Sequence, residues 1–286
     1  MPRYDTVSFL SDYGRVDEFV GVVHSVIRSI APQVRVIDIT HDIAPYDVRA
    51  GGLALVRAAN YLAPGVVVAV VDPTVGTARR PIAVEIGGGS SVLVGPDNGV
   101  LAPVVQLCGG ADRAVEIVNP EYRFTTEPGT FDGRDVFAPA AAHLCNGVDL
   151  SELGPVIDPI TLFPAMIPLT REDEGRLHAE VLWVDHYGNA QLNVDPDELD
   201  VFEDHVRLVM DDGARVARRV GTFAELDPNE IGLIVDSYGL VTIVLDKKSA
   251  AEELGLSGAS AVTIEAFDDD RPSSVITPVQ LGQRRS

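Results

Sequence analysis

The sequence predicts an α/β domain with a largely parallel sheet, followed by an all-β domain. The chain has 286 residues, a length typical of two domains. In its first half, short Val- and Ile-rich runs alternate with amphipathic segments, as expected for strands buried on both faces and joined by helices. In its second half, short alternating runs follow one another at barrel or sandwich spacing. We therefore expect an α/β domain at 1–160, a linker at 161–175 and a β domain at 176–286.

The expected strands of the first domain lie at 7–10, 34–39, 66–71, 82–86 and 92–94. Between the first two, apolar residues from Phe19 to Ile30 recur at spacings of three and four and form one face of a helix, which Asp17 is placed to cap. A second helix is expected at 47–61. This β-α-β-α-β order predicts a largely parallel sheet, in which ligands bind beyond the carboxyl ends of the strands.

Three consecutive glycines at 87–89 separate the runs at 82–86 and 92–94. A glycine cluster between two adjacent strands favours a hairpin turn over a phosphate-binding loop.

The segment that follows Leu150 is rich in proline and lacks periodicity, which predicts the linker between the domains. Beyond it, the runs at 177–194, 206–210, 217–223, 231–245 and 260–267 are expected to form strands. The last residues, 269–286, are expected to be partly disordered.

The charge balance excludes several classes of partner. Asp and Glu number 43 against 22 Lys and Arg, so the formal net charge is -21 and the protein repels nucleic acid and anionic membranes. Only two cysteines occur, and no apolar run reaches the length of about 18 residues that a membrane span needs. We expect a cytoplasmic, reduced protein that has no nucleic-acid or membrane partner.

Metal and cofactor chemistry lack their usual motifs. Asp12, Asp17 and Asp72 follow or flank predicted elements and suit a magnesium-dependent phosphatase. The chain contains no HxxxH, HExxH, CxxC or Walker motif, and no strand-GxGxxG-helix unit or GxSxG elbow. We therefore expect no metal and no cofactor. Taken singly, polar residues such as Arg79 and His143 also fit ordinary surface or core positions.

Seven segments occur in a distinctive order along the whole chain: SDYG (11–14), APYDV (44–48), VDPTVGTARR (71–80), PDNG (96–99), GRDVFAPAAAHL (133–144), DHYGN (185–189) and SYG (237–239). Together they resemble the S-adenosylmethionine (SAM) hydroxide adenosyltransferases, the SAM hydrolases related to fluorinase and chlorinase enzymes. The resemblance implies a Rossmann-like N-terminal domain, a C-terminal β-barrel and a homotrimer. It also implies active sites between the N-domain of one subunit and the C-domain of its neighbour, with SAM as substrate and no cofactor.

The resemblance implies a water-activating triad of Asp72, Arg79 and His143. Displacement of methionine from C5′ of the ribose requires a water in line with the breaking C–S bond. Arg79 and a protonated His143 would favour hydroxide, while Asp72 would orient the nucleophile or accept its proton. Arg80 is chemically equivalent to Arg79, and only the seven-residue spacing from Asp72 favours Arg79.

The resemblance also implies a set of substrate-binding residues, whose carboxylates, rings and amides suit ribose, adenine and the methionine ammonium group. They are Asp12, Asp17, Tyr46, Phe131, Gly133, Asp185, Tyr187, Asn189, Ser237 and Tyr238. Two positions depart from the family pattern. Asp132 stands where many relatives have His before GRD, and Gln191 stands where the halogenases have an aromatic residue.

Three alternatives to hydrolysis remain at this point. A chlorinase-like halogenase shares the fold and substrate, but a carboxylate at Asp72 would repel a halide, and only GGGSS (87–91) joins two strands where fluorinases carry a longer loop. A non-catalytic module that binds SAM or adenosine would not need the triad. The metal-dependent phosphatase would be abolished by a chelator.

Overall fold

The computed structural model describes residues 3–125 and 129–268. The chain forms two compact units, Met1–Ile167 and Pro168–Ser286, so the division falls inside the segment predicted as a linker. The predicted disorder of 269–286 lies outside the described residues. Each unit is described on its own below.

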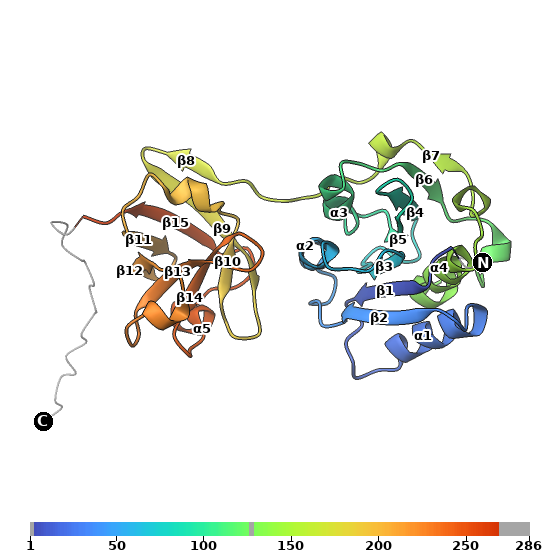
Figure 1. Cartoon of the computed structure of the whole chain (residues 1–286), viewed down its shortest axis with the longest axis horizontal. Helices are drawn as coiled ribbons and strands as arrows, with labels where there is room; N and C mark the ends of the chain where they lie inside the picture. Colours follow the sequence, from blue (N-terminus) through green and yellow to red (C-terminus); the bar gives the residue numbers. More distant parts are fainter. Residues whose placement is uncertain (1–2, 126–128, 269–286) are drawn as a thin grey trace, which may run out of the picture. The chain divides into compact units, whose positions relative to one another are not determined.

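The first unit contains a seven-stranded sheet with the order β2-β1-β3-β5-β4-β6-β7 (Figure 1). Its strands are β1 (Thr6–Ser11), β2 (Arg35–Thr40), β3 (Val66–Val70), β4 (Pro81–Ile86), β5 (Ser91–Pro96), β6 (Arg113–Glu116) and β7 (Val156–Ile157). The pairs β1–β2, β1–β3 and β3–β5 are parallel, and those that join β4, β6 and β7 to the sheet are antiparallel. The predicted α/β class is confirmed, with the parallel strands in the first part of the sheet.

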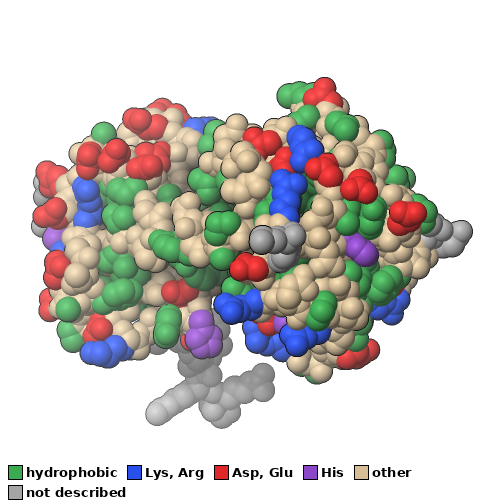
Figure 2. All heavy atoms as spheres, turned by 45° about the vertical axis from the view of Figure 1, so that its right-hand side comes forward, with side chains coloured by type: hydrophobic (Ala, Val, Ile, Leu, Met, Phe, Trp, Pro, Cys, Tyr) green, Lys and Arg blue, Asp and Glu red, His purple; other side chains and the backbone are tan. Residues whose placement is uncertain are grey.

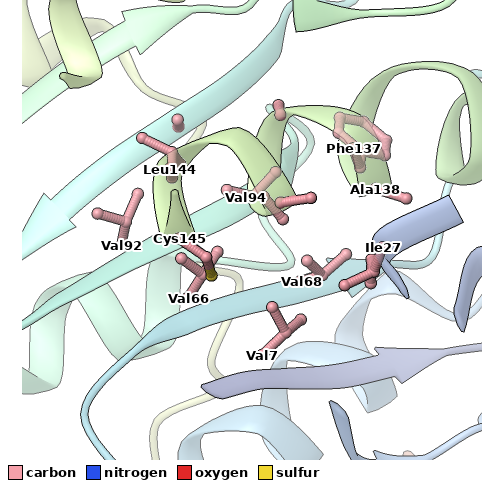
Figure 3. Close-up of a cluster of buried hydrophobic side chains, with 14 of the residues drawn as sticks. Val7, Ile27, Val66, Val68, Val92, Val94, Phe137, Ala138, Leu144 and Cys145 are labelled. Carbon is pink, nitrogen blue, oxygen red and sulfur yellow. The ribbon is translucent and has the colours of Figure 1, made fainter. Parts of the chain in front are cut away.

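Helices cover both faces of this sheet. They are α1 (Phe19–Ile30), α2 (Val48–Ala59), α3 (Ala102–Leu107) and α4 (Ala138–Cys145). Successive residues of a strand point to opposite faces, so Val66 and Val68 of β3 pack with α1 and α4, whereas Val67 and Ala69 pack with α2 and α3. Figure 3 shows the first of these cores, where α4 lies across the strands. Both faces of β1 and β3 are buried, as the apolar runs predict, whereas the edge strand β2 has only exposed and partly exposed residues.

The three glycines form the expected hairpin. Gly87, Gly88 and Gly89 all have positive φ, between 62° and 82°, which non-glycine residues rarely adopt. They join β4 to β5 in antiparallel register. This short turn leaves no room for an inserted loop at that point.

The helix starts differ in how they are capped. Glu18, not Asp17, occupies the N-cap position of α1, and no side chain forms a capping hydrogen bond there. The predicted cap at Asp17 is therefore wrong. At α2, Asp47 is the N-cap and accepts a hydrogen bond of 2.8 Å from the backbone N–H of Ala50.

The second unit is a closed β-barrel. Its strands are β8 (Arg171–Asp173), β9 (Arg176–Val184), β10 (Ala190–Leu192), β11 (His205–Met210), β12 (Gly213–Arg219), β13 (Ile231–Val235), β14 (Val241–Leu245) and β15 (Ala261–Ala266). The order β10-β14-β13-β12-β11-β15-β9 is closed by pairing of β10 with β9, and β8 adds to the outer side of β9. The predicted all-β domain is confirmed as a barrel.

The remaining elements are short. They comprise α5 (Ala250–Leu254), the π-helical turn η2 (Gly133–Phe137), and the 3-10 turns η1 (Pro120–Tyr122), η3 (Leu150–Glu152), η4 (Pro159–Thr161), η5 (Pro196–Leu199) and η6 (Phe223–Glu225). Within the described residues, no helix has both the length and the apolar character that a bilayer span requires.

Candidate active site

A cavity of about 360 Å³ lies beyond the carboxyl ends of β1 and β3. It is lined by Asp12, Tyr13, Phe19, Pro45, Tyr46, Val70, Asp72, Val75, Thr130, Phe131, Asp132 and Gly133. This is the edge of a parallel sheet at which ligands bind in α/β folds. Of the predicted residues, the structure brings Asp12, Tyr46, Asp72, Phe131 and Gly133 to one cavity.

Two carboxylates that line this cavity, Asp72 and Asp132, are bound by one arginine, Arg79. Arg79 Nε donates to Asp72 Oδ2 at 2.9 Å, Arg79 Nη2 contacts the same oxygen, and Nη2 also reaches Asp132 Oδ2 at 2.5 Å. The side chains are buried, with exposed fractions of 8% for Arg79, 5% for Asp72 and 13% for Asp132. Burial alone would lower the pKa of Arg79, but its bonds to Asp72 and Asp132 outweigh burial and raise it. Arg79 therefore stays cationic.

Asp12 organises the mouth of the cavity. Its Oδ2 accepts a hydrogen bond of 2.9 Å from the backbone N–H of Tyr46. Tyr46 has φ of +69°, unusual for a residue with a side chain, and its ring is 73% exposed. Burial, reinforced by the nearby charge of Asp72, raises the pKa of Asp12. Asp12 thus holds a strained turn that presents the Tyr46 ring.

Aromatic rings form one wall of the cavity. Tyr13, Phe19 and Phe131 pack edge to face or tilted, with ring centroids 5.1–5.8 Å apart. A Cβ at Gly133 would lie 2.2 Å from the Tyr13 hydroxyl oxygen, so only glycine fits there. Gly133 opens the π-helical turn η2, a type of turn that occurs often at functional sites.

Arg80 has a different role from Arg79. Its Nε donates to Asp97 Oδ2 at 2.9 Å, and its Nη2 donates to the Thr161 carbonyl oxygen at 2.6 Å. Arg80 therefore joins the end of β5 to the chain after β7. The structure separates two arginines that the sequence leaves chemically equivalent.

His143 is not brought to Asp72 and Arg79. The Phe137 ring, just before α4, lies 5.3 Å from the Arg79 guanidinium carbon. His143 is six residues further on, about 9 Å along a helix. That end of α4 reaches the start of β1, where Arg3 N–H donates to the Cys145 carbonyl at 3.1 Å; Figure 3 shows Phe137 and Cys145 at opposite ends.

The surroundings of His143 are those of a packed side chain. Its ring contacts Tyr122 at 5.1 Å between centroids, and no hydrogen bond or ion pair within the described residues joins it to Asp72 or Arg79. Burial lowers the pKa of His143, which disfavours the protonated form that the triad would use. Asp132 occupies the place beside Arg79 instead.

Asp17 also lies apart from the cavity. It is exposed just before α1 and does not line the cavity.

In the second unit, Asp185 shapes the turn between β9 and β10. Its Oδ1 accepts from the backbone N–H groups of Tyr187 at 2.8 Å and Asn189 at 2.9 Å, and its Oδ2 accepts from Asn189 Nδ2 at 2.7 Å. The carboxylate is thus committed to the turn, and Tyr187 is left 77% exposed.

The loop that carries Ser237 and Tyr238 is organised by Asp236, which the sequence analysis did not single out. Asp236 accepts from Tyr238 N at 2.8 Å, Thr242 Oγ1 at 3.0 Å and Gln191 Nε2 at 2.6 Å. Ser237 and Tyr238 are exposed. The buried Gln191 of β10 therefore holds this loop through its hydrogen bond to Asp236.

A separate cavity of about 500 Å³ occurs in the second unit. Tyr187 and Asn189 line it, together with Phe223 and residues 245–249. The predicted substrate residues of this unit thus include two cavity-lining side chains.

Sequence reasoning missed parts of the first cavity. Tyr13 lies within the SDYG segment and Phe19 on the expected helix face, and neither position by itself predicts a residue that lines a cavity. The signal at Asp132 is a carboxylate where many relatives have His before GRD.

Comparison with known proteins gives matches over both units. Residues 7–154 match the family model for the SAM hydroxide adenosyltransferase N-terminal domain, and residues 179–263 match that for the C-terminal domain. A protein of Salinispora tropica named (R)-S-adenosyl-L-methionine hydrolase is 41% identical over 260 residues, which cover 91% of this chain and 97% of the relative.

The chain is also similar to a fluorinase and to a solved structure. A fluorinase of Actinoplanes is 28% identical, over 90% of this chain and 96% of its own. The crystal structure of an uncharacterized conserved protein from Thermotoga maritima is similar with a TM-score of 0.83 and 32% identity, over 91% of this chain and 99% of that one.

Proposed function

Because the chain belongs to the SAM hydroxide adenosyltransferase family, we propose that it hydrolyses S-adenosyl-L-methionine to adenosine and L-methionine. The observation that carries the proposal is Arg79 held between Asp72 and Asp132 in an aromatic-walled cavity. The relatives named (R)-S-adenosyl-L-methionine hydrolase support the same substrate.

The reaction is a direct displacement by water. The water oxygen forms a bond to C5′ of the ribose while the C5′–S bond breaks, and its electron pair stays on sulfur, which becomes a neutral thioether. The attacking water loses a proton, which Asp72 accepts and passes to solvent. Arg79 fixes the orientation of the Asp72 carboxylate through its Oδ2, while Thr74 Oγ1 donates to Oδ1 at 3.1 Å. The remaining lone pair of Oδ1 is the one that receives the proton of the water.

Asp132 takes the third position of the catalytic group in this chain, in place of His143. It binds the Arg79 guanidinium opposite Asp72, so the three side chains carry a net charge of one negative unit. A negative site suits a cationic sulfonium substrate and repels a halide nucleophile. This charge favours a hydrolase over the halogenase alternative.

The other predicted residues bind the substrate in this proposal. Asp12 accepts hydrogen bonds from ribose hydroxyls or the methionine ammonium group, whereas Asp17, which does not line the cavity, is left out of the proposed set. Tyr46 and Phe131 pack against rings, and Gly133 leaves space for the Tyr13 side chain that lines the cavity. The second unit contributes Asp185, Tyr187, Asn189, Ser237 and Tyr238, of which Asp185 acts by holding its turn.

The oligomeric state and cellular location of the protein are also part of the proposed function. We propose a cytoplasmic homotrimer whose active sites combine the first unit of one subunit with the second unit of its neighbour. The reaction uses neither metal nor cofactor, since a carboxylate base and a charge-matched site supply the chemistry.

The test is incubation of SAM with the purified chain after treatment with a chelator. Adenosine and methionine in equal amounts are the expected products, by chromatography. Appearance of 5′-chloro-5′-deoxyadenosine in chloride buffer would favour the halogenase, and binding of SAM without turnover would favour the non-catalytic module. Magnesium-dependent release of phosphate from a phosphate ester, with no adenosine formed from SAM, would favour the phosphatase.

A further inference from the structure

Three side chains with metal-binding atoms converge beside β2, outside the cavity described above. His24 on α1 places Nε2 at 2.8 Å from Asp38 Oδ1 of β2, and His41, directly after β2, places Nε2 at 3.1 Å from the same oxygen. One ligand atom from each residue lies within 4.8 Å of the other two.

The buried member of this cluster has an unused nitrogen. The His41 side chain is 1% exposed, and its Nε2 has no hydrogen-bond partner among the described residues. Asp38 Oδ1 is near it but lies off the direction of a good N–H bond. An unpaired buried polar atom destabilises the fold, so its placement calls for a partner.

The other nitrogen of His41 is already held. Its Nδ1 lies 2.8 Å from Ser11 Oγ at the end of β1. With Nδ1 carrying the proton and donating to Ser11, Nε2 presents a lone pair toward Asp38 and His24. Metal-ligating histidines are oriented in this way by an outer hydrogen bond from the second nitrogen.

The surroundings favour ligation. The buried Phe9 ring lies 4.6 Å from the His41 ring and 6.3 Å from the His24 ring, which limits water on that side. The Asp38 carboxylate lies between the two imidazoles and is only 29% exposed.

We propose that His24, Asp38 and His41 form a binding site for a divalent transition metal such as Zn²⁺ or Co²⁺. Two imidazoles and one carboxylate suit these ions, whose bonds of about 2.0–2.2 Å join ligand atoms at such separations after small side-chain rotations. His24 and Asp38 can make these rotations because their side chains are 35% and 29% exposed. Solvent completes the coordination.

The site is structural rather than part of the reaction. None of its three residues lines the 360 Å³ cavity. His41 nevertheless holds the loop after β1, because its carbonyl accepts from the Gly14 N–H at 2.8 Å. A metal there joins α1, β2 and this loop, and it stabilises the folded state by mass action.

The test measures metal binding in the full chain rather than activity. The chain is stripped of metal and dialysed against micromolar Zn²⁺ with millimolar Mg²⁺, which occupies non-specific carboxylates on this acidic protein. We expect one Zn²⁺ per chain, a zinc-dependent rise in Tm, and visible absorption bands when Co²⁺ replaces Zn²⁺.

Substitutions at partly exposed ligands make the test specific. His24→Ala and Asp38→Asn should each weaken Zn²⁺ binding at least tenfold, while His205→Ala, an exposed histidine of β11, should bind like the parent. Unchanged binding in both ligand variants, or absence of a bound equivalent in the parent, would overturn the proposal. SAM turnover in chelator is a separate readout, so failure of one proposal leaves the other intact.

Discussion

At the scale of single residues, we expect substitutions of the neighbouring Arg79 and Arg80 to have different effects, one on kcat and the other on stability. Arg79→Gln removes the cation that orients Asp72, so we expect kcat to fall by about 10²-fold or more. Arg80→Gln instead leaves the buried Asp97 without its guanidinium, so we expect normal kcat and a loss of about 1–3 kcal/mol in unfolding free energy. Steady-state kinetics and denaturant unfolding measure the two effects.

The pair of variants controls for charge, since each loses one arginine. A large fall in kcat for Arg80→Gln with little change for Arg79→Gln would reverse the assignment of Arg79.

Asp132 and His143 offer a second matched comparison. Asp132→Ala removes one of the two carboxylates on Arg79, so we expect a drop in kcat of at least tenfold. His143→Ala removes a ring packed on Tyr122, so we expect lower Tm and kcat within about twofold of the parent. Kinetics with thermal unfolding distinguish the two.

The variant Asp132→His tests the same position by pH. A histidine titrates near pH 6.5, and its protonated form would place a second cation beside Arg79. As the pH is lowered, we expect the kcat of this variant to begin to fall at a higher pH than the kcat of the parent. An identical pH profile would argue that residue 132 does not act on Arg79.

The sequence predicts much of the site at this scale, but not all of it. Asp72 and Arg79 follow from their motif and spacing, and the structure joins them. The position of His143 cannot be predicted in the same way, because it depends on which end of α4 faces the cavity. A motif conveys residue order without the direction in which a helix crosses its sheet.

The antiparallel half of the sheet depends on a cluster of charges at the scale of elements. Glu85 of β4 is buried and accepts from Arg113 of β6 at 2.6 Å and from Arg3 at 2.5 Å. The bond from Arg113 is the main cause that holds the pKa of Glu85 below its usual 4.5. Glu85 thus joins β4, β6 and the start of the chain.

Glu85→Gln should lower the unfolding free energy by about 1–3 kcal/mol at neutral pH. Because the folded pKa is lowered, this stabilisation is fully present above the unfolded pKa of 4.5 and is lost as pH falls through the folded pKa. The difference in Tm between parent and variant should therefore shrink below pH 4.5. A constant difference from pH 7 to pH 3 would contradict it.

Elements with a strong local signal are predicted from the sequence, and short ones are not. β1 and β3 are continuously buried, with a wholly apolar run in β3, and α1 has an apolar face with spacings of three and four. The four residues of β6 are too few to show a period, and this strand is recruited by pairing with β4. Tertiary pairing, which local sequence does not carry, decides such cases.

At the scale of the whole molecule, acidic side chains are spread over the visible surface (Figure 2). The formal net charge of -21 opposes association, so a trimer needs specific contacts to form. Light scattering coupled to size exclusion should give three times the chain mass of 30.5 kDa at physiological salt. If the protein is a monomer in solution and still turns over SAM, its active site is not shared between subunits.

The central claim is that water attacks C5′ directly with Asp72 as its base, and oxygen labelling tests it most directly. In a single turnover of SAM in ¹⁸O-water, with enzyme in excess and chelator present, the adenosine 5′-oxygen should be fully labelled. Asp72→Asn should give at least about 10²-fold slower product formation in the same experiment. Unlabelled adenosine from the parent would instead mean that a carboxylate oxygen, most directly that of Asp72, attacks the ribose, and would contradict the account.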